Sequence, residues 1–307
     1  MGEKLLATKV DYKLNNGNSM PAFGLGTAYP PKPEDMHLVK ESVIAAVKAG
    51  YRMIDTAYLY GTQKAIGEAL QELYKDGVVK REDLFITTKV WPNFWNKVDD
   101  SINTSLKDLQ TDYVDLALQH WPLCYPMITD NETGYLVMTP KNEKGQTLTV
   151  KDADYLTTYR QLEKIYLDET DKRIRNIGVS NFTSQCVEDL LNDKSIKTVP
   201  AVNQIELNPE NPQLEVLELC KSKGIAVTAY SPYGSIGGPI LKTPLVKKLA
   251  EKFDISVNDV LISYLLTKGI IAIPRSWKPE RAGSTIYYKI LPADVIDELD
   301  GMNKIPN

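Results

Sequence analysis

Four side chains able to donate, accept or stabilise a proton follow apolar segments of the sequence: Asp55, Tyr60, Lys89 and His120. A carboxylate, a phenol, an ammonium and an imidazole are groups that enzymes use in acid–base chemistry. Each has an ordinary explanation by itself, because an Asp after a strand often caps a helix and a Lys at a strand end is usually solvated. Three consecutive apolar segments ending in such groups favour one shared site.

The segments that would position these groups alternate in character along the whole chain. Eight apolar segments are typical of buried parallel strands, and helical periodicity separates them. The segments are 22–27, 51–56, 84–90, 113–121, 175–181, 201–207, 225–231 and 270–276. The helical stretches are 38–49, 62–74, 98–109, 156–167, the region around 187–191, 214–220 and 257–267. This count predicts an α/β protein with a closed (β/α)8 barrel, with a doubly wound sheet as the alternative.

Irregular segments complete the expected barrel. A short hairpin with the turn "NNGN" is expected near Asp11–Met20, ahead of the first barrel strand. Two long loops, Pro122–Asp154 and Pro232–Pro244, follow the carboxyl ends of strands, where barrel active sites lie. Polar residues at the ends of different strands would meet at this mouth. We expect residues 1–307 to form one such domain.

Composition excludes several functions. The net charge is −4, without a basic stripe, so nucleic acid is not an expected partner. No apolar stretch approaches 18 residues and no secretion signal is apparent, so the chain is expected in the cytoplasm, away from membranes. Three scattered cysteines do not predict a disulfide framework. Two histidines cannot supply a metal site of several His ligands, so no metal is expected.

Seven motifs resemble the aldo-keto reductase family, and they occur in that family's order. They are "GYRMIDTAYLYG", "ITTKVW", "LQHWP", "IGVSNF", "NQIELNP", "AYSPYG" and "IPRS". The resemblance runs from Gly24 to about Asn303 and is strongest to fungal carbonyl and aldehyde reductases. A G-x-G-x-x-G motif is missing after the first strand, which argues against a Rossmann cofactor site.

The resemblance implies a catalytic tetrad of Asp55, Tyr60, Lys89 and His120. In this assignment Tyr60 is the general acid that protonates the carbonyl oxygen. The ammonium of Lys89 favours the phenolate, and Asp55 holds that ammonium in place. His120 donates a hydrogen bond to the substrate oxygen as charge develops there.

The resemblance also implies NADPH as the cofactor. Ser180, Asn181 and Gln204 match positions that hold the nicotinamide carboxamide, and Tyr230 matches the aromatic residue that stacks on the ring. The further implied contacts are Gly26, Thr27 and Asp55, with Ser231 and Ser235 along the pyrophosphate.

The resemblance implies that the segment "IPRSWKPERAGST" determines a preference for NADPH over NADH. Arg275, Ser276 and Arg281 match the site of the adenosine 2′-phosphate, and paired guanidinium groups bind phosphate well. A solvated basic helix start is the alternative interpretation. Ser284 and Thr285 replace the Glu and Asn that many members carry, which predicts a looser hold on adenosine.

The expected substrate pocket is apolar and partly open. Its walls are expected to be Ala28, Tyr29, Trp91, His120 and Trp121, although both tryptophans could instead be structural plugs. We therefore expect bulky or varied aldehydes and ketones as substrates, with small sugars or polyols as one alternative. A cofactor-sensing regulatory barrel with little turnover is the other. A monomer is expected, and a dimer is possible.

Overall fold

Eight parallel strands form the central sheet of the computed structural model, which describes residues 3–28, 32–234 and 237–303. Their spatial order follows the sequence, from β4 to β11. The strands are β4 (Leu25–Gly26), β5 (Met53–Asp55), β6 (Phe85–Val90), β7 (Leu116–Gln119), β8 (Ile177–Ser180), β9 (Val202–Glu206), β10 (Ala226–Tyr230) and β11 (Ile271–Ala272). All six residues of β6 are buried, as expected for a parallel strand covered on both faces.

Hydrogen bonds between the first and last strand regions close this sheet into a barrel. Gly24 N donates to Ala272 O at 3.0 Å, and Gly26 N donates to Pro274 O at 2.8 Å. A Cβ atom on Gly26 would lie 2.7 Å from Ile273 O, so only glycine permits this approach of the two backbones. The predicted (β/α)8 barrel is therefore confirmed, and the doubly wound alternative is wrong.

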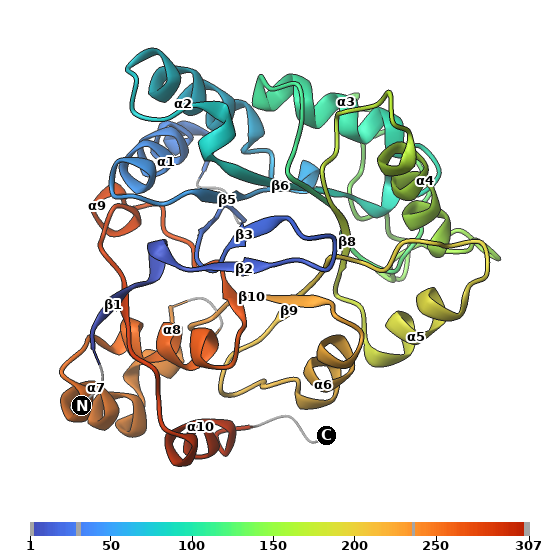
Figure 1. Ribbon diagram of the computed structural model, residues 1–307. Coiled ribbons are helices and arrows are strands. Elements are labelled where there is room, and N and C mark those ends of the chain that lie inside the picture. Colours follow the sequence, from blue (N-terminus) through green and yellow to red (C-terminus); the bar gives the residue numbers. More distant parts are fainter. Residues whose placement is uncertain (1–2, 29–31, 235–236, 304–307) are drawn as a thin grey trace.

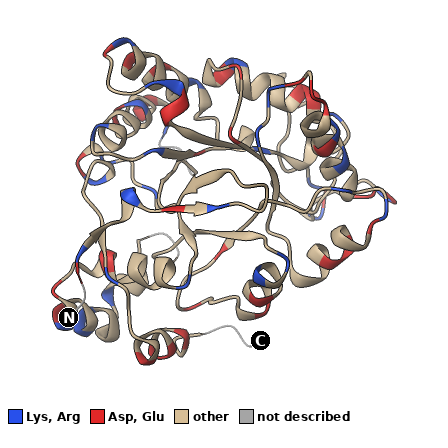
Figure 2. Cartoon of the chain, viewed as in Figure 1, with Lys and Arg blue, Asp and Glu red and all other residues tan. Residues whose placement is uncertain are grey.

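Helices surround the barrel (Figure 1). In the described ranges they are α1 (His37–Lys48), α2 (Gln63–Lys75), α3 (Val98–Leu109), α4 (Leu156–Leu167), α5 (Ser184–Asn192), α6 (Leu214–Ser222), α7 (Pro244–Phe253), α8 (Val257–Thr267), α9 (Pro279–Ala282) and α10 (Ala293–Asp300). On α2 the buried residues Ile66, Leu70 and Leu73 repeat at helical spacing. Charged residues of both signs are interspersed over these outer helices, while the strands are largely uncharged (Figure 2).

The predicted hairpin is present as β2 (Asp11–Lys13) and β3 (Ser19–Pro21), and it lies across the centre of the barrel in Figure 1. Side chains fasten it to the amino ends of the strands. Asn16 and Asn18 both donate to Asn176 Oδ1, at 2.6 and 2.9 Å, and Asn176 donates to Asp115 O at 2.6 Å. Because Asp115 and Asn176 precede β7 and β8, the hairpin covers the end of the barrel opposite the mouth.

Some elements differ from the sequence-based expectation. The apolar segment 113–121 forms a strand only over Leu116–Gln119, with an isolated bridge between Val114 and Ile174 ahead of it. Helices α7, α9 and α10 were not among the expected stretches. Residues Leu5–Leu6 (β1) also pair antiparallel with Tyr287–Tyr288 (β12). In the ranges that the structure describes, no helix is long and apolar enough to span a membrane.

Candidate active site

A cleft of about 1930 Å³ opens at the carboxyl ends of the barrel strands. Residues from β4, β5, β8, β9 and β10 and from the loops that follow the strands line it. The loop after β7 and the segments after β10 and β11 extend its walls. The functional side chains expected from the sequence therefore have a common space in which to meet.

Lys89 lies at the centre of the predicted tetrad and is fully buried. Its Nζ atom donates to Asp55 Oδ1 at 2.5 Å, to Thr56 O at 3.0 Å and to Tyr60 Oη at 3.2 Å. The parallel register of β5 and β6, with Asp55 opposite Thr87, makes this possible, because Lys89 then projects from the same face two residues further on. Tyr60 ends a short 3-10 turn (Tyr58–Tyr60), which the left-handed Gly61 (φ +66°) terminates.

Asp55 has a second partner that the sequence analysis did not connect to it. Gln204 Nε2 donates to Asp55 Oδ2 at 2.7 Å, so both carboxylate oxygens are engaged. Thr27 Oγ1 donates to the backbone oxygen of Asp55 at 2.8 Å. The carboxylate is thus held from β6 and β9, and the backbone of Asp55 is held by Thr27, which fixes the carboxylate beside Lys89.

Burial is the main cause of the pKa shifts of Lys89 and His120. Burial lowers the pKa of Lys89, and the charge of Asp55 opposes this shift. Burial also holds the pKa of His120 well below its usual value, and the positive charge of Lys89 adds to the effect. A neutral imidazole beside a phenol and an ammonium can donate or accept a hydrogen bond without bringing a further charge into the cleft.

His120 lies between two aromatic rings. Its ring centroid is 5.6 Å from that of Tyr60 and 4.9 Å from that of Trp91, both edge-on. Its buried Nδ1 atom has no hydrogen-bond partner among the described residues. The imidazole ring packs between Tyr60 and Trp91, next to the other members of the predicted tetrad.

The residues expected near a nicotinamide lie together at the ends of β8, β9 and β10. Asn181 Nδ2 donates to His120 O at 3.0 Å, and Tyr230 Oη donates to Asn181 Oδ1 at 2.8 Å. Ser180 Oγ donates to Gln204 O at 2.8 Å. With Ser231 they line the cleft next to the tetrad, and they offer amide and hydroxyl groups beside an aromatic ring. This donor set fits a nicotinamide.

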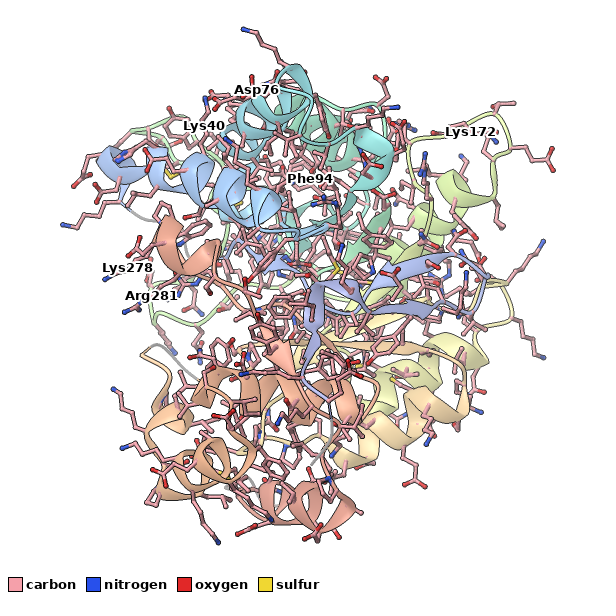
Figure 3. All side chains as sticks on the ribbon, turned by 60° about the vertical axis from the view of Figure 1, so that its left-hand side comes forward. Lys40, Asp76, Phe94, Lys172, Lys278 and Arg281 are labelled. Atoms are coloured by element: carbon pink, nitrogen blue, oxygen red, sulfur yellow. The ribbon has the colours of Figure 1, made fainter. Side chains whose placement is uncertain are left out.

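The residues predicted to bind the 2′-phosphate also line this cleft. Arg275, Ser276 and Arg281 line it, and Arg281 lies near Lys278 on one side of the molecule (Figure 3). Ser284 Oγ donates to Arg281 O at 2.7 Å, so its hydroxyl already has a protein acceptor. Two guanidinium groups and a hydroxyl group lining one cleft fit a phosphate group.

Most expected pocket residues also line the cleft. Ala28, Trp91, His120 and Trp121 do so. Trp91 is almost completely buried at 6% exposure, whereas Trp121 is 37% exposed at the rim. Tyr29 and Ser235 lie outside the described residues. No group of three or more His, Cys, Asp or Glu side chains in the described ranges could hold a metal ion.

Several lining residues were not expected from the sequence. Leu59 and Tyr233 lie within quoted motifs, so their position next to expected residues could have identified them. Asn258 on α8 and Lys4 near β1 carry no comparable signal. Lys4 reaches the cleft through the pairing of β1 with β12, and its Nζ atom donates to Asp254 O at 3.2 Å.

Comparison with known proteins assigns the class. Residues 22–243 match the Aldo/keto reductase family. The chain is 38% identical over 295 residues to aldehyde reductase YPR1 of Saccharomyces cerevisiae, covering 95% of this chain and 90% of that protein. It is 39% identical over 270 residues to D-galacturonate reductase of Hypocrea jecorina, covering 88% and 82%.

Solved structures agree in fold. The aldose reductase from Schistosoma japonicum superposes with a TM-score of 0.85 at 30% identity, covering 97% of this chain and 93% of that one. The aldo-keto reductase AKR2E5 complexed with NADPH gives 0.82 at 31% identity, covering 96% and 88%. The chain belongs to the aldo/keto reductase family. The resemblance inferred from its motifs is confirmed, and the chain is an oxidoreductase of that family.

Proposed function

We propose that this aldo-keto reductase reduces aldehydes and ketones to alcohols with NADPH, with Tyr60 as the general acid. The observation that carries the proposal is the position of Lys89 Nζ, 2.5 Å from Asp55 Oδ1 and 3.2 Å from Tyr60 Oη. When bound, NADPH supplies a hydride to the carbonyl carbon. Tyr60 donates its phenolic proton to the carbonyl oxygen, so that hydride and proton together yield the alcohol.

The surrounding residues would support this proton transfer. The Lys89 ammonium stabilises the phenolate left on Tyr60, and Asp55 and Thr56 O keep the ammonium directed at it. His120 donates a hydrogen bond to the substrate oxygen while negative charge develops on it. Trp91 packs edge-on against His120, which is buried.

The proposal of NADPH as cofactor has two kinds of support. AKR2E5 was solved with NADPH, and the Bombyx mori aldo-keto reductase AKR2E4 was solved with NADP. In this chain, Ser180, Asn181 and Gln204 would hold the nicotinamide carboxamide, with Tyr230 against the ring. Gly26, Thr27, Asp55 and Ser231 line the same cleft and would contact the cofactor, and Arg275, Ser276 and Arg281 would hold the 2′-phosphate.

Bulky or varied carbonyl compounds are the substrates that we propose. The support is an apolar wall of Ala28, Trp91 and Trp121 beside His120, with Trp121 partly exposed at an open rim. Small sugars and polyols are the second candidate, because relatives of this chain include D-galacturonate reductase and glycerol 2-dehydrogenase (NADP(+)).

A spectrophotometric assay tests these proposals. Oxidation of NADPH and of NADH is followed with an aromatic aldehyde, an α-keto ester, a diketone and an aldose, for the native chain and for Tyr60→Phe. Faster turnover of the bulkier carbonyls, lost in Tyr60→Phe, is the expected result. Turnover restricted to the aldose would support the sugar reductase. Tight NADPH binding without any turnover would instead indicate a cofactor-sensing protein.

We also propose that the chain acts as a monomer in the cytoplasm. The three cysteines Cys124, Cys186 and Cys220 are free, as is usual in a reducing compartment. Light scattering of the purified chain gives the mass directly, and 34.5 kDa is expected for a monomer. A fluorescent fusion reports the compartment.

A further inference from the structure

The 33-residue stretch Pro122–Asp154 after β7 folds back on itself, and it reaches the cleft only through Trp91, since none of its own residues, all within the described ranges, lines the cleft. In its first part, Val137 N donates to Ile128 O at 2.8 Å and Asp130 N donates to Tyr135 O at 2.9 Å, which makes residues 126–138 a hairpin. We call residues 126–138 the loop hairpin. It has few apolar residues in the core, because Met127, Ile128 and Tyr135 are exposed. Its position must therefore depend on specific attachments.

Two side chains that follow β6 make those attachments. Asn93 is 1% exposed, and its Nδ2 atom donates to Pro126 O at 2.9 Å and to Val137 O at 3.3 Å. One amide therefore joins the two legs of the loop hairpin at its base. Beside it, Trp91 Nε1 donates to Met138 O at 2.6 Å. Both donors lie in or next to the short 3-10 turn Pro92–Phe94, so a single rigid segment holds the loop hairpin.

Trp91 connects this attachment to the cleft. Its indole ring lines the cleft and packs edge-on against His120, at 4.9 Å between ring centroids. On another side the indole ring contacts Tyr125, with 6.1 Å between ring centroids. Tyr125 immediately precedes the loop hairpin in the sequence. Asn93 does not line the cleft itself. The position of the wall beside His120 is thus linked to the loop hairpin through one ring and one N–H group.

We propose that Asn93 and Trp91 determine substrate size selectivity by holding the loop hairpin against Trp91, so that the indole ring stays fixed as a wall of the pocket. Trp91 contributes as a lining residue and as an anchor, and Asn93 is a positioning residue that acts through the loop hairpin. The proposal rests on the carbonyl reduction proposed above and deepens it. With the anchor intact, the pocket is preformed and a bulky substituent must fit the existing space. When these hydrogen bonds are lost, the Trp91 ring can shift and the pocket can accept a larger substituent.

Two variants separate the anchor from the ring. Trp91→Phe keeps an aromatic ring and removes the N–H group. Asn93→Ala removes both hydrogen bonds that the side-chain amide donates, and it changes no residue that lines the cleft. Both are expected to raise the ratio of kcat/KM for a bulky α-keto ester over that for a short aldehyde. A rise of roughly three- to tenfold corresponds to the loss of one or two buried hydrogen bonds. NADPH affinity, measured by fluorescence titration, should stay the same.

Non-additivity gives a further test, because both residues act on one element. The double variant should change the ratio no more than the larger single change. Asn192→Ala, at the exposed end of α5, is the matched control and should leave the ratio unchanged. Hydrogen exchange of the chain without cofactor should show faster exchange in residues 126–138 in both variants.

The outcomes separate this inference from the proposed function. An unchanged ratio in Asn93→Ala, with faster exchange in 126–138, would overturn the inference while leaving the reductase assignment intact. Unchanged exchange would overturn the anchoring itself. Absence of turnover in the native chain would overturn the proposed function, and the exchange data would still decide whether the anchor exists.

Discussion

The ammonium of Lys89 lies 3.2 Å from the phenolic oxygen of Tyr60. Lys89 has two further acceptors, and one of them, the Asp55 carboxylate, is itself held by Gln204 from across the barrel. The side chain therefore has little freedom to leave Tyr60. We therefore expect replacement of the residues that hold Lys89 in this geometry to lower kcat more than it lowers the affinity for ligands.

Replacement of Lys89 by methionine tests this expectation. Lys89→Met keeps an unbranched side chain, one heavy atom shorter, and removes the charge that stabilises the Tyr60 phenolate. We expect kcat to fall by about 100-fold or more, within the range of general acid catalysis, while NADPH affinity changes little. Single-turnover kinetics measures the chemical step. Activity within about tenfold of the native chain would show that Tyr60 does not need the ammonium.

His120 should make stability depend on pH. Burial holds its pKa well below the value of about 6.5 for an unfolded histidine. As the pH falls below about 6.5, the unfolded chain takes up a proton that the folded chain does not, so the free energy of unfolding decreases. The loss from this residue is at most about 1.4 kcal/mol per pH unit.

Urea unfolding of His120→Gln between pH 7 and 5 measures that contribution. The variant should lose less stability than the native chain over this interval. His37→Gln is the control, because His37 is exposed at the start of α1 and its replacement should keep the native pH dependence. Equal pH dependence in His120→Gln and the native chain would mean that His120 is protonated in the folded state.

Arg281 should determine the preference for NADPH over NADH. Loss of a charge-assisted bond to phosphate lowers affinity by roughly ten- to a hundredfold. We therefore expect Arg281→Ala to weaken NADPH binding by that factor and to leave NADH binding unchanged in calorimetric titration. Lys278→Ala removes a neighbouring positive charge (Figure 3) and should have a much smaller effect. Equal losses in both variants would favour a general basic surface.

Asp115, at the opposite end of the barrel, should affect stability without affecting catalysis. It is 6% exposed and lies 2.7 Å from Arg81 and 3.5 Å from Arg175, and it accepts a hydrogen bond from Ile86 N. Asp115→Ala removes these interactions and leaves the buried Ile86 N–H group without its acceptor, which costs about 1–3 kcal/mol. Urea unfolding should show this loss, while kcat/KM at low temperature stays the same. A fall in kcat/KM without a loss of stability would contradict the assignment.

Residues 1–307 are predicted to form a single domain. The same urea experiments should then show one transition, with fluorescence and circular dichroism changing together. The chain offers four tryptophans as fluorescent reporters. Two separated transitions would indicate that part of the barrel unfolds independently of the rest.

Local patterns were enough to predict the barrel, and the family resemblance implied the tetrad. Alternation of apolar segments with helical periodicity depends on neighbouring residues, and it identified the strands that carry Asp55, Lys89 and His120. The same patterns overestimated strand lengths, as in 113–121, because an apolar segment shows burial and not the extent of pairing. They also left α7 and α10 unidentified.

Contacts between distant residues required the tertiary structure. Gln204 and Asp55 are 149 positions apart, and only the register of the strands around the barrel brings the amide within 2.7 Å of the carboxylate. Asn93 meets the loop hairpin in the same way, through a turn and a loop with no shared pattern. Hydrophobic periodicity specifies which face of an element is buried. It carries no information about which polar group a distant element places opposite, and that pairing arises when the barrel closes.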